Sequence, residues 1–113
     1  MAIVASGRLD QRITLQKKTV LRGSLGGHDE SWSMLAVVYA ETLDMSGREL
    51  FNAKAMGSEA TIKITIRWRN DVHPDMRVVF QDGTMARIEW IMRVTRKQYM
   101  ELYCLSLDDG SYE

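Results

Sequence analysis

A helix start is encoded in the middle of a chain that otherwise has the pattern of β-strands. Residues 46–49 read Ser-Gly-Arg-Glu. The Ser46 side chain can accept a hydrogen bond from the backbone N–H of Glu49, while the Glu49 carboxylate accepts one from the N–H of Ser46. We expect one short helix from Ser46 to about Met56. In a β-rich chain such a helix is expected to cover an open end or edge of the sheet, or to present a face to a partner.

Alternating apolar and polar residues predict strands on both sides of this helix. The clearest alternation spans 61–69, where three isoleucines and Trp68 alternate with threonine, lysine and arginine. One face of this strand is expected in the core, and the other is expected to be cationic and exposed to water. Five further stretches favour strands: 12–16, 32–43, 77–80, 85–91 and 99–105.

Turn signals separate these strands. Asp82-Gly83 predicts a tight type I′ hairpin, because that turn needs two residues with positive φ. Pro74, the only proline, ends the preceding strand. Residues 22–30 concentrate glycine among polar residues and are expected to form a mobile loop. The last reversal is expected near 96–98.

The elements together predict one domain spanning residues 1–113. With 45% apolar residues, the chain can form a single modest core. The expected fold is mainly β (α+β), a small antiparallel β-barrel or tight sandwich of about six strands with one helix after the second strand, because so many twisted strands in a short chain curl. Residues 1–8 are expected to be a flexible N-terminal arm, and 108–113 a flexible tail.

Charge and composition argue against several classes of protein. Fifteen Lys and Arg balance fifteen Asp and Glu, so the chain lacks the positive field of a dedicated nucleic-acid-binding protein. Its apolar runs are too short for a membrane span, and residues 1–6 are too short for a signal peptide. We therefore expect a soluble protein made in the cytoplasm. The single cysteine, Cys104, lies in an apolar run and is expected to be a buried core thiol.

The residues that could carry catalysis or bind metal do not form a recognisable arrangement. His28 and His73 lack the spacing of metal ligands, and the glycines of 22–30 lack the Gly-Lys-Ser/Thr ending of a phosphate loop. The acid pairs at 71 and 75 and at 108 and 109 lie in loop-like segments and are expected to be solvated carboxylates. The sequence therefore predicts no enzyme, no metal site and no cofactor.

Arginine recurs on the predicted strands, and Trp68 and Trp90 lie close in sequence to some of these arginines. Such a strand face can bind single-stranded nucleic acid, but arginine is also enriched at protein interfaces, where it pairs with carboxylates. Eight methionines fit irregular contact surfaces, although most are expected to fill the core. The arginines concerned are Arg67, Arg69, Arg77, Arg87, Arg93 and Arg96.

Apolar residues are spread around the predicted helix more widely than one core stripe requires. They are Leu50, Phe51, Ala53, Ala55 and Met56. One face can pack on the sheet while another meets a neighbouring subunit. On this hypothesis, Lys54→Glu leaves the monomer folded but weakens assembly.

The ordered set of motifs resembles the phage head-tail joining (head-closure, or head-tail adaptor) protein family. The likeness begins with the pattern L-x-x-R-I-x-L, continues through a Gly-rich loop before Trp32, and extends to about Leu105. The motifs are Arg-Leu-Asp-Gln-Arg-Ile-Thr-Leu at 8–15, Tyr-Ala-Glu at 39–41, Ser-Gly-Arg-Glu-Leu-Phe at 46–51, Ile-Thr-Ile-Arg-Trp-Arg at 64–69 and Met-Arg-Val at 76–78.

The resemblance implies a small barrel that assembles rather than catalyses. Subunits would associate head-to-tail into a ring beneath the portal of the virion, retain packaged DNA and offer a docking surface to the tail. Portal or adaptor proteins and tail proteins would be the partners, and DNA would pass through the channel without sequence-specific binding. The 22–30 loop would become ordered against neighbours or the portal. Expected interface residues are Arg22, Leu25, His28, Asp29, Arg48, Phe51, Lys54, Arg67 and Arg69.

Two alternatives stay open. The chain could be a tail-completion protein of the same virion, or a small barrel that binds single-stranded nucleic acid through its arginine and tryptophan faces. Arg67 and Arg69 could line either a subunit interface or the channel. A channel lining would make DNA retention sensitive to salt, whereas interface arginines would make ring formation sensitive to salt.

Overall fold

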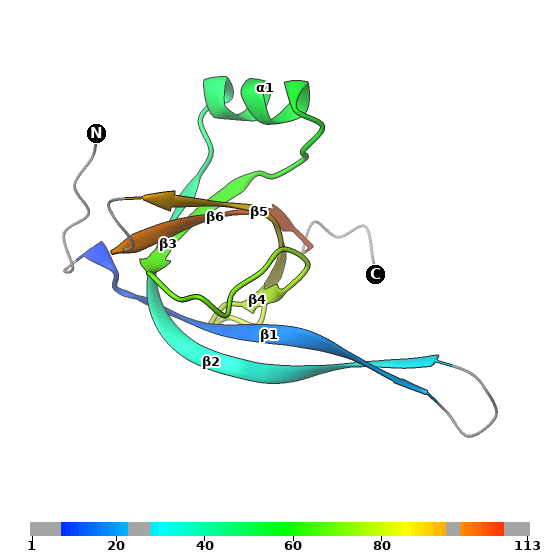
Figure 1. The fold of residues 1–113 in the computed structure, drawn as a ribbon. Helices are drawn as coiled ribbons and strands as arrows, with labels where there is room; N and C mark the ends of the chain where they lie inside the picture. Colours follow the sequence, from blue (N-terminus) through cyan, green and yellow to red (C-terminus); the bar gives the residue numbers. More distant parts are fainter. Residues whose placement is uncertain (1–7, 23–27, 95–97, 108–113) are drawn as a thin grey trace.

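The computed structural model describes residues 8–22, 28–94 and 98–107. It confirms a mainly β fold with one short helix after the second strand (Figure 1). The elements are β1 (Gln11–Arg22), β2 (His28–Asp44), α1 (Gly47–Ala55), β3 (Ile62–Arg67), β4 (Arg77–Val79), β5 (Met85–Val94) and β6 (Tyr99–Ser106).

The six strands close into an antiparallel barrel in the order β1-β2-β3-β6-β5-β4. The three-residue strand β4 completes the closure, since it pairs with β1 on one side and with β5 on the other. Its contact with β1 extends only from Thr14↔Val79 to Gln16↔Arg77. Within the described residues, the start of β1 at 11–13 has no strand partner on the β4 side, so the barrel mouth at this seam is open.

Alternate residues of every strand fill the barrel. Ile13, Leu15, Ile64, Ile66 and Leu102 are at most 1% exposed and belong to one continuous core. The predicted alternation over 61–69 is therefore confirmed on its inner side. On its outer side the prediction of a wet face is wrong at Thr65, which is 3% exposed; it lies between the longer side chains of its cross-strand partners Glu41 and Glu101.

A β-bulge in β5 sets which side chains face outward above the barrel. Ile88 pairs with Cys104, but the next cross-strand pair is Trp90 with Tyr103, so Glu89 is the extra residue. This shift turns Trp90 to the same outer face as Tyr103, and their rings stack with centroids 3.9 Å apart and planes 2° apart. Cys104 itself is buried, as expected.

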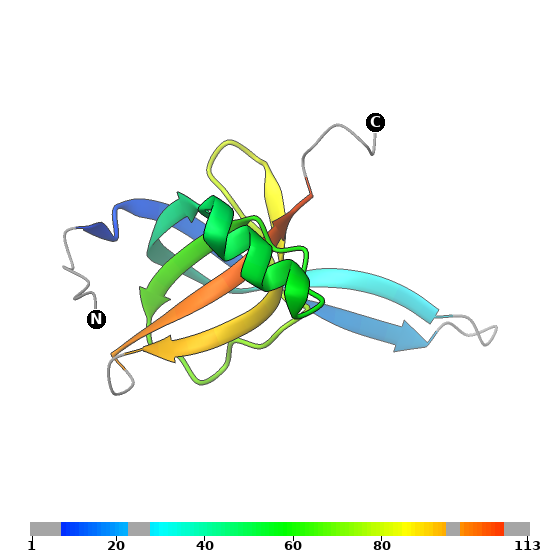
Figure 2. The ribbon, with the colours of Figure 1, turned by 90° about the horizontal axis from the view of Figure 1, so that it is seen from above.

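The strands β1 and β2 continue beyond the barrel as a two-stranded hairpin (Figures 1 and 2). Their pairing runs without a break from Lys17↔Ser33 to Arg22↔His28. The predicted first strand, 12–16, is thus too short, and the predicted loop 22–30 is wrong at its ends, where Arg22 and 28–30 are in strands. Backbone pairing holds this ribbon outside the core, so no apolar alternation marks it. Residues 23–27, with Leu25, lie outside the described residues.

The β4–β5 hairpin is confirmed, but its turn is not type I′. Gly83 has φ of 91°, whereas Asp82 is not among the described residues with positive φ, which a type I′ turn requires. The N–H of Gly83 donates to the Phe80 carbonyl and the N–H of Phe80 to the Thr84 carbonyl, giving a three-residue loop. Asp82 braces it by accepting hydrogen bonds from the Thr84 N–H and hydroxyl, at 2.9 and 2.6 Å.

The helix α1 begins as the sequence predicts. The Glu49 N–H donates to the Ser46 hydroxyl at 3.2 Å and the Ser46 N–H donates to the Glu49 carboxylate at 2.9 Å. The expectation that α1 covers an open end or edge is wrong: it lies over the outer face of β5 and β6 (Figure 2). The β5 bulge explains this position, because it places an apolar aromatic pair on that outer face. No helix of the described residues is long and apolar enough to cross a membrane.

Candidate interaction surfaces

The helix α1 is held above the barrel by a small apolar cluster and by two carboxylates. Ala53, the buried residue of the helix, and the partly buried Leu50 pack over the Trp90–Tyr103 stack. Met45 and Ala60, on either side of the helix in sequence, complete the cluster. The indole N–H of Trp90 is buried and has no hydrogen-bond partner.

Glu49 anchors the start of α1 to β3. Its carboxylate accepts a hydrogen bond from the Lys63 ammonium at 2.9 Å in addition to that from the Ser46 N–H. The Ser46 backbone and then Lys63 lower the pKa of Glu49 below its ordinary value. The predicted cationic face of β3 is therefore neutralised at Lys63 by the helix that lies above it.

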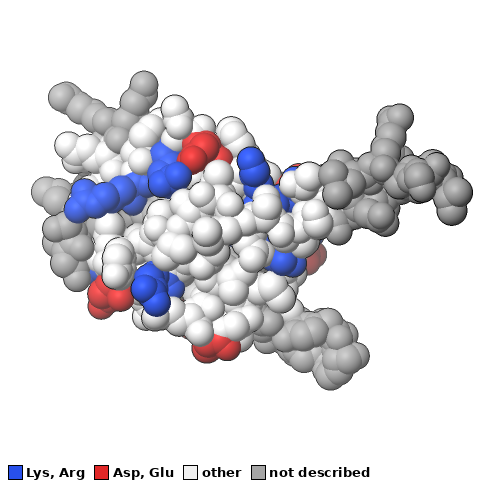
Figure 3. Space-filling model, turned by 90° about the horizontal axis from the view of Figure 1, so that it is seen from below, with Lys and Arg blue, Asp and Glu red and all other residues white. Residues whose placement is uncertain are grey.

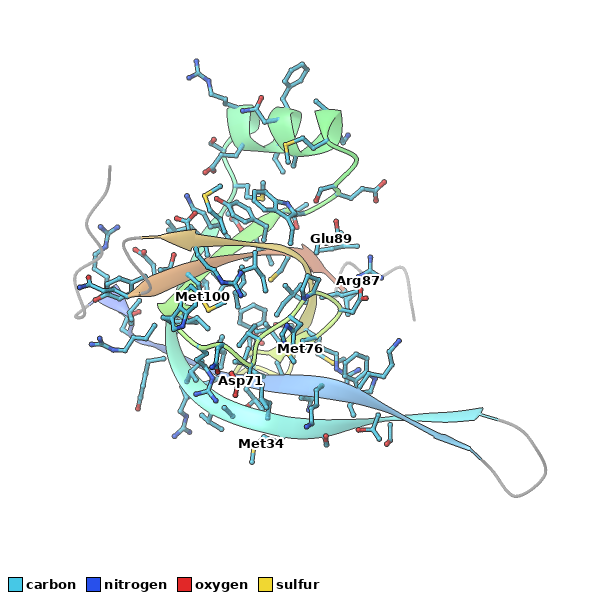
Figure 4. The ribbon with its side chains drawn as sticks, viewed as in Figure 1. Met34, Asp71, Met76, Arg87, Glu89 and Met100 are labelled. Atoms are coloured by element: carbon cyan, nitrogen blue, oxygen red, sulfur yellow. The ribbon has the colours of Figure 1, made fainter. Side chains whose placement is uncertain are left out.

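Glu89 anchors the chain that returns from α1. Its carboxylate accepts hydrogen bonds from the Ser58 hydroxyl at 2.9 Å and the Glu59 N–H at 3.0 Å, and it forms an ion pair with Arg87 at 2.8 Å (Figure 4). The bond from Arg87 is the main cause that lowers the pKa of Glu89. Glu89, the extra residue of the bulge, thus links β5 to the chain after α1 by hydrogen bonds.

The outer side of α1 carries a row of exposed residues, Arg48, Phe51 and Lys54, which we name the helix stripe. Their spacing of three residues puts them on one face. Phe51 is 73% exposed, and both cations are exposed. Apolar surface of the helix therefore faces away from the sheet, and its contact with a neighbouring subunit stays a prediction. Met56, at the end of the helix, is also exposed.

A groove of about 630 Å³ lies at the open seam of the barrel mouth, and we name it the mouth groove. Leu43, Ile62 and Phe80 supply apolar walls, and Asp44 and Asp82 supply carboxylates. The hydrogen bond from the Thr84 side chain is the main cause that lowers the pKa of Asp82. Among the described residues, no cation lines the groove. Its lining is completed by four uncharged polar residues: Gln11, Thr42, Gln81 and Thr84.

The outer face of β2 exposes a further apolar patch on the opposite side of the barrel from α1. Met34, Val37 and Tyr39 are 65%, 50% and 58% exposed, and Met34 points away from the barrel (Figure 4). Figure 3 views the molecule from below, with uncharged residues over the centre and Lys and Arg side chains towards the margin. Sequence reasoning did not identify this patch, although every residue over 34–40 is apolar, a pattern typical of a strand with both faces covered.

The strand arginines do not form one binding face. Arg93 stacks over Trp68 with its guanidinium carbon 4.8 Å from the ring centroid, and Arg67, which is exposed, lies 5.8 Å over Tyr99. Arg69 donates two hydrogen bonds to Asp71, at 3.0 and 2.8 Å, and these lower the pKa of Asp71. Arg67 and Arg69 line one hollow together with Trp68, Leu9, Val38 and Tyr39.

Arg77 belongs to a separate cluster at the base of the projecting hairpin. Its guanidinium carbon lies 4.1 Å over the Trp32 ring, and its Nε donates to Gln16 at 2.8 Å. A different hollow collects Lys18, Trp32, Arg77 and Arg87, and it has no residue in common with the hollow at Arg67. Trp90 lines neither hollow, because it packs under α1. Arg96 lies outside the described residues.

Eight of the nine predicted interface residues are among the described residues, and they fall in three separate places. Arg48, Phe51 and Lys54 are together on α1, and Arg67 and Arg69 are together at the end of β3. Arg22, His28 and Asp29 belong to the projecting hairpin, where the backbones of Arg22 and His28 pair and Asp29 pairs with Leu21. Leu25 lies outside the described residues. The sequence did not indicate Leu43, Asp44 or Asp82, because the mouth groove forms only when β2 and the β4–β5 turn come together.

In the described part of the chain, no three His, Cys, Asp or Glu side chains converge on a site that could hold a metal ion. His73 is exposed in the loop before β4. The Cys104 thiol is fully buried, and burial raises its pKa well above the ordinary value, so it does not present a reactive thiolate.

Comparisons with known proteins indicate one family. Residues 4–107 match the family described as phage head completion protein. Over 77 residues the chain is 31% identical to "Head completion protein gp7" of Enterobacteria phage HK97, which covers 68% of this chain and 69% of that protein.

Two solved structures share the fold. The solution structure of protein SF1141 from Shigella flexneri 2a superposes with a TM-score of 0.80 at 23% identity, covering 94% of this chain and 99% of that one. A chain from the virion of a native gene transfer agent particle superposes with a TM-score of 0.57 at 16% identity, covering 84% and 91%. At these identities the likeness establishes the barrel fold.

Proposed function

Because the chain belongs to the phage head completion protein family, whose members are structural proteins of the virion, we propose that it is a head-closure connector subunit of a tailed phage or prophage. Copies form a ring beneath the portal, retain the packaged DNA and provide the surface on which the tail docks. Before assembly the protein resides in the host cytoplasm.

The structural observation that supports this proposal is the location of the exposed apolar side chains. The barrel interior is filled by side chains that are almost completely buried, whereas Phe51, Met34 and Tyr39 are more than half exposed on its outside. Exposed apolar patches of this kind are typical of protein interaction sites. These observations favour binding of other proteins to the outer surface over binding of a ligand inside the barrel.

The partners proposed are the portal or adaptor proteins on one side and the tail proteins on the other. The projecting β1–β2 hairpin is suited to reach a neighbour, and we propose that its outer end, with the 22–30 segment, packs against adjacent subunits or the portal. Limited proteolysis tests this part: assembled protein should be protected at 22–30 relative to the free subunit, and equal protection would refute it.

DNA is proposed to pass through the ring without sequence-specific binding. The chain has a formal net charge of zero, and its strand arginines are divided between separate clusters in which aromatic rings and carboxylates already occupy them. Filter binding with oligonucleotides at moderate salt should show no sub-micromolar affinity. Tight binding would instead favour a nucleic-acid-binding role.

Electron microscopy of the protein mixed with its cognate portal tests the position in the connector. The proposal predicts an additional ring of density on the portal, and cross-links from this chain to portal or adaptor subunits. If the chain leaves the portal bare and cross-links only to tail-tube subunits, it is a tail-completion protein.

A further inference from the structure

We propose that the helix stripe of one copy docks into the mouth groove of a second copy, with Phe51 entering the groove between the flanking cations Arg48 and Lys54. This inference rests on the proposed function, because that function supplies the neighbouring copy, and it specifies the surfaces through which copies meet. The occupant of the groove is a second copy of this chain.

The helix stripe is a free apolar and cationic ridge. Phe51 is 73% exposed and does not line the mouth groove of its own chain, so its ring is available to another molecule. Arg48 and Lys54 lie about 9 Å apart along the axis, at 1.5 Å per residue. Glu49, the acid nearest the stripe, is turned to Lys63 and Ser46, which leaves the stripe uniformly positive.

The mouth groove has the complementary chemistry. Its apolar walls, Leu43, Ile62 and Phe80, suit an aromatic ring, and its carboxylates, Asp44 and Asp82, suit two cations. Leu43 is 44% exposed, so a docked ring would remove apolar area from water on both partners. The volume of about 630 Å³ lies in the range of sites that bind small ligands, which is enough for one Phe side chain.

The two surfaces occupy different places on each copy. Every copy can therefore donate its α1 to one neighbour and accept the α1 of another, which makes the interface heterologous. Interfaces of this type close into rings when the rotation between neighbours fits, and otherwise extend as filaments. The pairing of stripe with groove is consequently compatible with the ring of the proposed function.

Cysteine cross-linking between copies tests the contact directly. Cys104 is fully buried, so an introduced surface cysteine would be the reactive thiol among the described residues. One preparation carries Ala55→Cys, one helix turn after Phe51, and the other carries Gln81→Cys, an exposed residue that lines the mouth groove, so Phe51 and the apolar walls stay intact. A short bis-maleimide is added to the mixture and to cognate particles assembled from it. We expect a covalent dimer in the mixture and none from either variant alone. Ala55→Cys mixed with Met34→Cys is the control and should give no dimer, because Met34 is exposed away from the groove.

Charge reversal tests the proposed complementarity. Arg48→Glu/Lys54→Glu should lower the yield of the cross-linked dimer at least tenfold, as should Asp44→Lys/Asp82→Lys, and joining all four changes in one chain should restore at least half of it. Glu59→Lys, a charge reversal at an exposed residue outside both surfaces and outside the projecting hairpin, should have no effect. Since Asp82 braces its turn, Asp44→Lys alone serves as the second groove variant.

The outcomes separate this inference from the proposed function. Failure of the Ala55–Gln81 cross-link in particles that need the chain to keep their DNA would overturn the inference and leave the function standing. Failure of the four-change chain to recover, despite native folding by circular dichroism, would likewise overturn the charge pairing. If particles keep their DNA without the chain, the proposed function fails, while a specific cross-link in the purified mixture would still support the contact.

Discussion

The barrel and the helix segment that lies on it are stabilised in different ways. In the barrel, Ile64, Ile66 and Leu102 have no exposed surface and belong to one apolar core. In α1 the buried residue is Ala53, and the segment is held by a capping box and by the carboxylates Glu49 and Glu89. The barrel is thus stabilised by a large apolar core, whereas α1 is attached by a small apolar cluster and a few polar contacts and leaves most of its own surface exposed.

This difference explains how assembly surfaces can change without loss of the fold. Burial of apolar area is the dominant favourable term in folding, and it is concentrated inside the barrel. A surface change on α1 therefore alters contacts with other molecules, whereas a change inside the barrel alters the free energy of unfolding.

Truncation inside the barrel should have the largest effect. Leu102→Ala should lower the free energy of unfolding by about 2–5 kcal/mol, because it removes a fully buried side chain and leaves a cavity. Leu43→Ala is the matched control on a strand surface, where Leu43 is 44% exposed, and it should cost less than about 1 kcal/mol. Urea denaturation measures both. Equal losses would show that the barrel interior is not the main source of stability.

Loss of the contacts that hold residues 58–59, after α1, against β5 should have an intermediate effect on the free energy of unfolding. Glu89→Ala removes the acceptor of the Ser58 and Glu59 hydrogen bonds and the ion pair with Arg87, and it should cost about 1–3 kcal/mol. Ser46→Ala, which removes the cap at the other end of the segment, should cost about 1 kcal/mol. Hydrogen exchange should then rise in α1 more than in β3 and β6. A uniform rise in the barrel would contradict the separation of the two regions.

Acid should loosen the helix segment in a predictable direction. The pKa of Glu89 in the folded chain lies below its ordinary value of 4.5, so its carboxylate binds protons less readily in the folded than in the unfolded chain. Its contribution to stability is therefore complete above about pH 4.5 and is lost as the pH falls through the lowered pKa. The gap in unfolding free energy between the wild type and Glu89→Gln should narrow below pH 4.5. A constant gap would show that the charge of Glu89 contributes nothing.

Surface changes on α1 should have the smallest effect on stability. Phe51→Ala should alter the free energy of unfolding by less than about 0.5 kcal/mol, because the ring is mostly exposed and alanine favours helix. Lys54→Glu should likewise leave the chain folded. Both should nevertheless reduce incorporation into connector rings, measured by quantifying the chain in purified particles. Normal incorporation of both variants would show that α1 is not an assembly surface.

Local patterns predicted the parts of the fold that depend on neighbours in sequence. The capping box needs only Ser46 and Glu49, and the inner face of β3 needs only alternation, so both were readable and both are confirmed. The methionines show the limit of this reasoning: Met45, Met76 and Met100 are buried, but Met34, Met56 and Met92 are exposed, so the expectation that most fill the core is not met among the described residues.

Features that depend on distant partners could not be predicted. The β5 bulge at Glu89 has no sequence signal, yet it determines which face of β5 carries Trp90 and hence where α1 lies. The mouth groove depends on the shortness of β4, which leaves the seam with β1 open. The projecting hairpin is held by backbone pairing, which side-chain patterns do not reveal.

The central claim, that this chain acts in the virion through its outer surfaces, is tested most directly by particles assembled without it. We expect heads that lose their packaged DNA and bear no tails, with both defects repaired by adding the purified wild-type chain but not the folded Phe51→Ala/Lys54→Glu variant. Particles that lack the chain and still retain full genomes and attached tails would contradict it.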